Sequence, residues 1–140
     1  MGISRLALLL ATASVLVSFV YASSDSGKAG ESAVLELNPE NFDKETLNPE
    51  KHVFVMFYAP WCGHCKRLKP KWEELARGMS SETSVVIARL DADKHNAIAK
   101  RLEVRGYPTL VLFAKGKKEG VRYEGSRDVE ALKEFIKSHM

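Results

Sequence analysis

The chain has 140 residues and a formal net charge of +3 at pH 7, which leaves room for one domain and excludes a strongly basic or acidic protein. Its lysines and arginines are scattered rather than gathered into stripes, so the composition does not favour nucleic-acid binding. The chain is long enough to bury a real core without disulfide staples. It contains two cysteines, Cys62 and Cys65.

The first 22 residues have the layout of a secretory signal peptide. Arg5 precedes an apolar run over residues 6–20, and small residues follow up to Ala22. An uncleaved membrane anchor is the alternative, but the run is shorter than the roughly 18–20 residues that a spanning helix needs. We therefore expect cleavage after Ala22, a flexible linker rich in Ser and Gly over residues 23–32, and no membrane segment in the mature chain.

Apolar periodicity predicts nine elements in the rest of the chain. In order they are a strand at 34–37, a short helix from Asn38 to about Leu47, a strand at 52–58, a helix at 66–79, a strand at 85–90, a short helix ending at Leu102, strands at 109–113 and 121–123, and a helix at 129–136. The order β-α-β-α-β-α-β-β-α predicts an α/β fold with a mixed central sheet and helices on both faces.

Local signals mark the ends of several helices. Asn38 and Pro39 fit the cap and the first turn of the first helix. Pro70 lies inside the 66–79 helix and is expected to kink it. Either Ser126 or Asp128 would cap the last helix.

Cys62 and Cys65 follow the strand at 52–58 and lie where the next helix begins. Backbone N–H groups and the helix dipole favour negative charge there, so a thiol is biased toward its reactive thiolate form. A disulfide between residues three apart closes almost no chain and adds little stability, which indicates a bridge that is used chemically. We expect Cys62 to be the exposed attacking sulfur and Cys65 to be the less exposed resolving thiol.

Two cysteines at this spacing are also found in zinc sites. Half of a zinc site is the alternative interpretation of two cysteines at this spacing, but zinc needs two more ligands, and none of the four histidines forms a pair at the spacing that zinc sites use. We therefore predict no metal and no bound cofactor. His64 would instead add a positive charge or a hydrogen bond to the Cys62 thiolate, and Gly63 would leave room for an approaching sulfur.

Two segments together resemble a known family. Phe57–Lys66, which holds the cysteines, and Arg105–Thr109 downstream closely resemble the catalytic domains of protein disulfide isomerases, which belong to the thioredoxin superfamily. The resemblance runs from about Ala33 to Ile136. It implies a thioredoxin fold for a thioredoxin-like domain over residues 33–140.

The resemblance also implies roles for four residues outside the cysteine pair. Pro108 matches the cis-proline that lies against the sulfurs in this family, and Tyr107 and Trp61 would border an apolar patch that holds extended substrate. The alternative for Trp61 is an ordinary core position. Arg127 matches an arginine that tunes the resolving cysteine, and the alternative is an ordinary exposed arginine.

One position departs from the family pattern. Members of the family usually carry a buried acid on the strand before the cysteines, and this chain has Met56 there. The lysine that commonly pairs with that acid aligns with Arg89. Because the acid helps to take the proton from the resolving thiol, we expect release of the mixed disulfide to be slow near neutral pH unless water or Arg127 substitutes.

These observations predict an enzyme. We expect a thiol–disulfide oxidoreductase and protein disulfide isomerase that forms, reduces and reshuffles disulfides, with two alternatives: a thioredoxin-like protein-disulfide reductase and a non-catalytic chaperone-like binding module. The expected partners are unfolded or misoxidised polypeptides with cysteines, and glutathione or another recharging oxidant. The protein is expected to be a monomer that binds no nucleic acid.

The expected location is the secretory pathway, and within it the lumen of the endoplasmic reticulum. The last four residues, 137–140, are not a retention signal of the Lys-Asp-Glu-Leu type. Secretion or another endomembrane compartment therefore stays open.

Overall fold

A computed structural model describes residues 31–140. It contains β1 (Leu35–Leu37), α1 (Phe42–Thr46), β2 (His52–Tyr58), α2 (Gly63–Gly78), β3 (Val85–Asp91), α3 (Asn96–Arg101), β4 (Thr109–Phe113), β5 (Gly120–Tyr123) and α4 (Val129–Lys137). This order confirms the predicted one. The predicted signal peptide, residues 1–22, and all but the last two residues of the predicted linker, 23–32, lie outside the described residues.

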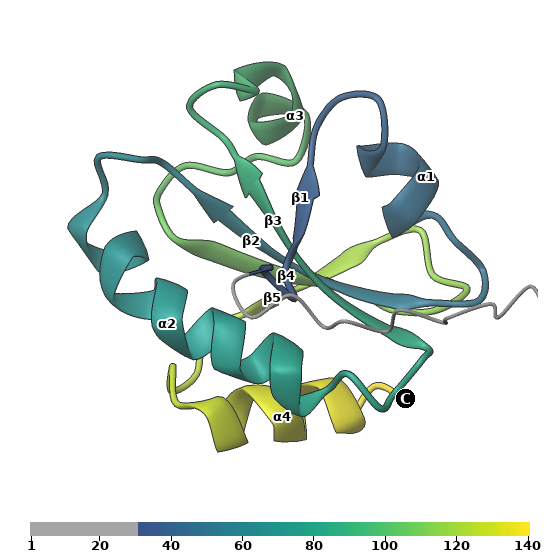
Figure 1. Ribbon diagram of the computed structural model, residues 1–140. Helices are drawn as coiled ribbons and strands as arrows, with labels where there is room; N and C mark the ends of the chain where they lie inside the picture. Colours follow the sequence, from purple (N-terminus) through teal and green to yellow (C-terminus); the bar gives the residue numbers. More distant parts are fainter. Residues whose placement is uncertain (1–30) are drawn as a thin grey trace, which may run out of the picture.

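The five strands form one mixed sheet with the order β1-β3-β2-β4-β5 (Figure 1). β3 pairs in parallel with β1 and β2, whereas β4 pairs antiparallel with β2 and β5. β2 therefore lies at the centre and is paired on both edges. Six of its seven residues, from His52 to Phe57, are buried, which is why its sequence is an almost unbroken apolar run.

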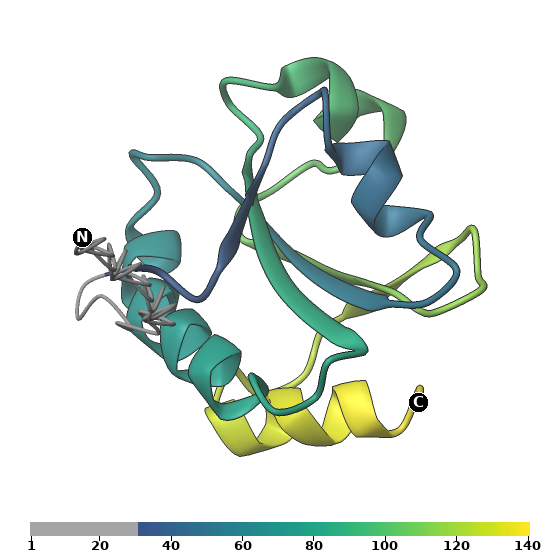
Figure 2. The same ribbon diagram turned by 45° about the vertical axis from the view of Figure 1, so that its right-hand side comes forward.

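Helices cover both faces of the sheet, as predicted. α2 and α4 lie on one face and α1 and α3 lie on the other, and the view in Figure 2 agrees with that in Figure 1 on this arrangement. Alternate residues of β2 fill the two cores: Phe54 and Met56 pack under α2 and α4, while Val53, Val55 and Phe57 pack under α1 and α3.

Trp72 fixes α2 to the sheet. Its side chain is 1% exposed, its ring lies 4.8 Å from that of Phe54, and its indole N–H donates to the carbonyl of Ala88 on β3 at 2.9 Å. The helix continues through Pro70 from Gly63 to Gly78. Trp72 thus anchors the middle of α2 to the sheet, and the first turn of α2 lies near the end of β2.

The first helix begins later than predicted. It starts at Phe42 rather than at Pro39, because the side-chain oxygen of Asn38 accepts the backbone N–H groups of Glu40 and Asn41 at 2.8 and 3.1 Å and so forms a turn. At the last helix, Asp128 is the cap, since its carboxylate accepts the N–H of Ala131 at 2.9 Å. Within residues 31–140, none of the helices is both long and apolar enough to span a membrane.

His52 is a buried titratable residue at the start of β2. It is 6% exposed, and its Nδ1 accepts the backbone N–H of Lys115 at 3.1 Å. Burial lowers the pKa of His52 below its usual value of 6.5, and the positive charges of Lys115 and His139 lower it further. The folded protein therefore holds His52 in its neutral form.

We expect this group to make the fold less stable in acid. Because the unfolded chain binds the His52 proton more readily, the free energy of unfolding falls as the pH drops through 6.5, by at most about 1.4 kcal/mol per pH unit for this one proton. Urea unfolding at pH 7.5, 6.0 and 5.0 should show that the free energy of unfolding falls less with acid in His52→Gln than in the unaltered protein, because glutamine does not titrate. Parallel losses in the two proteins would contradict this prediction.

Candidate functional site

The two cysteines lie at the junction between β2 and α2. α2 begins at Gly63, three residues earlier than predicted, because Cys62 caps the helix: its sulfur accepts the backbone N–H of Cys65 at 3.3 Å. Cys62 itself is extended, with φ −77° and ψ 116°, and its carbonyl accepts the N–H of Lys66 at 3.1 Å. A sulfur therefore takes the place that a Ser or Asp oxygen usually fills at a helix start.

Both cysteines are buried free thiols. Cys62 is 6% exposed and Cys65 is 4% exposed, so the prediction that Cys62 is an exposed sulfur is wrong. They pack with Ala59, and Tyr58 and Tyr107 lie against this cluster. The Cys62 thiol is 3.6 Å from the carbonyl oxygen of Tyr107. The two residues expose similarly small fractions of their surface, but burial and the neighbouring groups change the pKa values of the two sulfurs in opposite directions.

The surroundings of Cys62 favour its thiolate. Burial on its own raises the pKa of Cys62, but hydrogen bonds from the Cys65 thiol and from the backbone N–H groups of Cys65 and His64 outweigh burial. The positive charge of Arg127 acts in the same direction. The net result is a pKa below the ordinary value of a cysteine, which is the property of a nucleophilic thiol.

The surroundings of Cys65 favour its thiol. Burial raises its pKa to about 12, and the hydrogen bond and negative charge that it shares with Cys62 act in the same direction. A hydrogen bond involving the backbone of Ala59 and the charge of Arg127 lower the pKa only in part. The pair thus divides into one sulfur that is readily ionised and one that holds its proton.

An exposed aromatic rim lies beside the sulfurs. Trp61 is 66% exposed, which rules out the alternative that it is a core residue. Its ring meets that of Tyr107 edge to face, with centroids 5.8 Å apart. The Tyr107–Pro108 peptide bond is cis, and the carbonyl of Tyr107 is the group that faces Cys62.

His64 is placed differently from the prediction. Its ring nitrogen Nδ1 contacts the guanidinium Nη2 of Arg67 at 3.0 Å, and its contribution to Cys62 comes from its backbone N–H. From the sequence, Arg67 is either a source of positive potential at the cysteines or part of a solvated helix face, as are Lys66, Lys69 and Lys71. Its contact with His64 was not predicted, although its position three residues after His64 places the two on the same side of a helix. A side-chain carbon on Gly63 would meet no atom within 4 Å, so the space at Gly63, next to Cys62 in the chain, is open.

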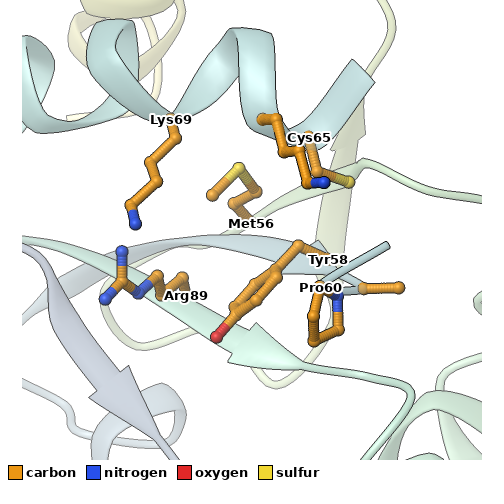
Figure 3. Close-up of a pocket in the computed structure, with 8 residues that line it drawn as sticks. Met56, Tyr58, Pro60, Cys65, Lys69 and Arg89 are labelled. Carbon is orange, nitrogen blue, oxygen red and sulfur yellow. The ribbon is translucent and has the colours of Figure 1, made fainter. Parts of the chain in front are cut away.

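A pocket of about 290 Å³ lies beneath Cys65 on the side of α2 that faces β3. It is lined by Met56, Tyr58, Ala59, Pro60, Cys65, Lys66, Lys69 and Arg89. In Figure 3, Met56 lies between the helix that carries Cys65 and the strand that carries Arg89, and Lys69 and Arg89 extend toward each other. Met56 also pairs with Arg89 in the β2–β3 register. This pocket has no carboxylate in its lining.

The acids that accompany Arg89 lie outside that lining. Glu36 on β1 contacts Arg89 at 2.5 Å, and Glu73 on α2 lies 3.7 Å from it. Tyr58 donates to Glu36 at 2.9 Å, and burial, followed by this hydrogen bond, raises the pKa of Tyr58 to about 12. The prediction did not include Glu36 and Glu73, because their proximity to Arg89 depends on strand register and helix packing.

Metal ligands do not gather around the cysteines. Among residues 31–140, the structure holds no group of three or more His, Cys, Asp or Glu side chains placed to bind a metal ion. The chemistry available at this site is therefore that of two thiols with unequal acidity, three residues apart on one helix turn.

Comparison with known proteins gives a consistent result. The sequence matches the thioredoxin family over residues 33–138. It is 50% identical over 105 residues to protein disulfide isomerase-like 2-1 of Oryza sativa subsp. japonica, an alignment that covers 75% of this chain and 29% of the relative. It is 46% identical over 123 residues to protein disulfide-isomerase erp38 of Neurospora crassa, covering 87% of this chain and 33% of the relative.

Solved structures agree with the sequence comparison. The first thioredoxin domain of mouse protein disulfide-isomerase A4 superposes with a TM-score of 0.68 at 34% identity, covering 77% of this chain and 76% of that domain. Human ERp44 also gives a TM-score of 0.68, at 38% identity, covering 77% of this chain and 29% of that one. The chain spans about a third or less of the length of the two curated relatives given above.

The unequal acidity of the cysteines leads to a direct test. In the reduced protein at pH 7, a short reaction with iodoacetamide should label Cys62 and leave Cys65 unlabelled, because alkylation requires the thiolate. Fragment-ion mass spectrometry of the peptide that holds both residues locates the label. Arg127→Gln should slow labelling of Cys62 by about two- to fivefold, since an exposed charge is lost. Equal labelling of both cysteines would overturn the assignment.

Proposed function

This chain belongs to the thioredoxin family, and from that membership we propose that it is a thiol–disulfide oxidoreductase of the protein disulfide isomerase type. Its described residues form a thioredoxin domain homologous to the catalytic domains of protein disulfide isomerases. The observation that carries the proposal is the division of acidity between Cys62 and Cys65 on the first turn of α2. Chemically, that division suits one sulfur for attack and the other for resolution.

The reaction proceeds in two exchanges. The Cys62 thiolate attacks one sulfur of a substrate disulfide, which forms a mixed disulfide and releases the other substrate sulfur as a thiolate. Cys65 then loses its proton and attacks the sulfur of Cys62, so that the Cys62–Cys65 disulfide forms and the second substrate thiol leaves. The reverse sequence oxidises a substrate dithiol. Attack of a substrate thiol on the mixed disulfide reshuffles the substrate's bonds.

The site suits a polypeptide substrate. The exposed Trp61 and the half-buried Tyr107 provide aromatic surface beside the sulfurs, on which an extended chain with a cysteine can pack. Unfolded or misoxidised polypeptides are thus the proposed substrates, and glutathione or another oxidant is the proposed recharging partner. We place this activity in the secretory pathway, and within it the endoplasmic reticulum lumen, where disulfides form. The predicted signal peptide at residues 1–22 supports this placement.

A thioredoxin-like reductase is the second candidate. Hydrogen bonds from the backbone of His64 and Cys65 and the charge of Arg127 stabilise the Cys62 thiolate, and stabilising the reduced form makes the disulfide a stronger oxidant. Because these groups make the disulfide a stronger oxidant, they favour an isomerase over a reductase. The two functions differ in reduction potential, at about −180 mV for protein disulfide isomerase and about −270 mV for thioredoxin.

Titration against glutathione separates the candidates. We expect the Cys62–Cys65 couple to equilibrate at about −180 mV, measured by mass spectrometry of alkylated samples across a series of glutathione ratios. Cys65→Ala should accumulate a mixed disulfide at Cys62, because the resolving sulfur is gone. A value near that of thioredoxin would favour the reductase. Full refolding activity in a protein that lacks both cysteines would favour a non-catalytic binding module.

Met56 provides a test of the resolving step. Cys65 must lose a proton whose pKa is about 12, and the pocket beneath it offers no carboxylate to accept it. Met56→Glu would place an acceptor there, beside the cations Lys69 and Arg89. We expect this change to speed the attack of Cys65 on the mixed disulfide near pH 7 by about tenfold, which is less than a fully positioned general base contributes.

Stopped-flow fluorescence with a self-quenched peptide disulfide separates the two exchanges. The second-order phase reports attack by Cys62, and the first-order phase that follows reports resolution by Cys65. Met56→Glu should speed the first-order phase alone, and Met56→Gln is the uncharged control of the same length. An equal rate in Met56→Glu and the unaltered protein, or an equal gain in Met56→Gln, would contradict a role for the missing acid.

A further inference from the structure

A second hollow lies on the other side of α2 from the Met56 pocket. It has a volume of about 170 Å³ and is lined by His64, Arg67, Leu68, Lys71 and Arg127. Four of these five side chains are basic, and no acid is among them. We call this feature the basic hollow.

The spacing of its residues explains why they meet. His64, Arg67 and Lys71 are separated by three and four positions, so they form one row along α2. The contact of 3.0 Å between the guanidinium of Arg67 and the ring of His64 holds the start of this row together. Arg127 comes from the segment between β5 and α4, and α4 packs alongside α2 (Figure 1). Two elements distant in sequence thus build one basic surface.

The cations of the basic hollow make no ion pair within the described residues. The ion pairs found among residues 31–140 involve Arg89, Arg101 and Lys133, and none involves Arg67, Lys71 or Arg127. Asp128 feels the charge of Lys71, but its carboxylate already caps α4 and accepts the hydroxyl of Ser126. An external anion would therefore meet three cations that make no ion pair, with the charge of Lys71 offset in part by the nearby Asp128.

The basic hollow also lies close to the reactive sulfur. The backbone N–H of His64 faces Cys62, and the charge of Arg127 acts on both cysteines. The space in front of Gly63, between Cys62 and His64, is open. A molecule bonded to Cys62 would thus have its neighbouring groups within reach of this surface.

Resting on the proposed function, we propose that the basic hollow is an anion subsite that selects disulfide substrates carrying a carboxylate next to the reacting sulfur. Glutathione disulfide and a peptide with an acidic residue beside its cysteine share this chemistry. The carboxylate makes no bond in the reaction. It is held by Arg67, Lys71 and Arg127 while the Cys62 thiolate attacks, the substrate disulfide breaks, and one substrate thiolate leaves.

Alkylation of Cys62 tests the subsite without depending on enzyme activity. Iodoacetate and iodoacetamide are nearly the same size and react with the same thiolate, but only iodoacetate carries a carboxylate. The ratio of their rate constants therefore cancels any change in the ionisation of Cys62. The measurement uses Cys65→Ala, in which Cys62 is the only thiol.

Charge reversal at the basic hollow should lower that ratio. We expect Arg67→Glu with Lys71→Glu to reduce it by about three- to tenfold, in line with local electrostatic steering. Lys117→Glu with Lys118→Glu makes the same change of charge in the turn between β4 and β5 and should leave the ratio unchanged. Raising the salt concentration to 0.5 M should lower the ratio in the starting protein toward that of the reversed variant, because exposed charges are screened. An unchanged ratio in the Arg67 and Lys71 variant, or an equal fall in the control, would overturn the proposal.

Disulfide substrates then identify the source of the carboxylate and separate the subsite from the proposed function. Glutathione disulfide is compared with the neutral hydroxyethyl disulfide, and peptide disulfides with glutamate beside cysteine are compared with glutamine and lysine versions. If a preference for glutathione disulfide is lost on charge reversal, glutathione is the source of the carboxylate. If a preference for the acidic peptide is lost, the source is a peptide. If every disulfide reacts but charge reversal changes no ratio, the proposed function stands and the subsite is overturned. If no disulfide reacts while the alkylation ratio still falls, the anion site stands and the proposed function is overturned.

Discussion

The hydrogen bond from the backbone N–H of Cys65 to the sulfur of Cys62 is the contact on which both the local fold and the chemistry depend. A helix start leaves N–H groups without partners, and a capping side chain must accept them. Here the cap is the sulfur to which we assign the attack. Because a thiolate accepts a hydrogen bond more strongly than a thiol does, ionising Cys62 strengthens the start of α2, and the start of α2 in turn favours ionisation.

Rigid packing keeps this contact in place. β2 is buried along nearly its full length and ends at Tyr58, four residues before the reactive sulfur. Trp72 ties the middle of α2 to β3 through its indole N–H. The junction between strand and helix therefore has little freedom, and the sulfur is presented in one geometry. Trp61, in contrast, extends from this frame into solvent, while Tyr107 is half-buried against the cysteines.

The buried strands were predictable from the sequence, whereas the burial of Cys62 and most local polar contacts were not. The apolar run at 52–58 gave β2 its correct limits, because a strand buried on both faces needs apolar residues throughout. The starts of α1 and α2 were misplaced, since each depends on one side chain: Asn38 forms a turn in place of a helix, and Cys62 caps in place of a Ser or Asp. The proximity of the two cysteines was predictable because only two residues separate them in the chain. The contacts of Glu36 with Arg89 and of His64 with Arg67 require strand register and side-chain direction.

The two sides of α2 carry different groups near the two cysteines. Beneath Cys65, the pocket holds the uncharged Met56 and no carboxylate, so this side adds no acceptor for the proton. Its cations are Arg89, which is paired with Glu36 and Glu73, together with Lys66 and Lys69. On the other side, the row that begins at His64 carries unpaired cations beside Cys62. Attack depends on the charge around Cys62, whereas resolution depends on proton loss from Cys65. Under the proposed function, substitutions in the basic hollow are expected to change substrate selection, and substitutions at Met56 are expected to change the lifetime of the mixed disulfide. Arg127 belongs to both effects, because its charge acts on both cysteines.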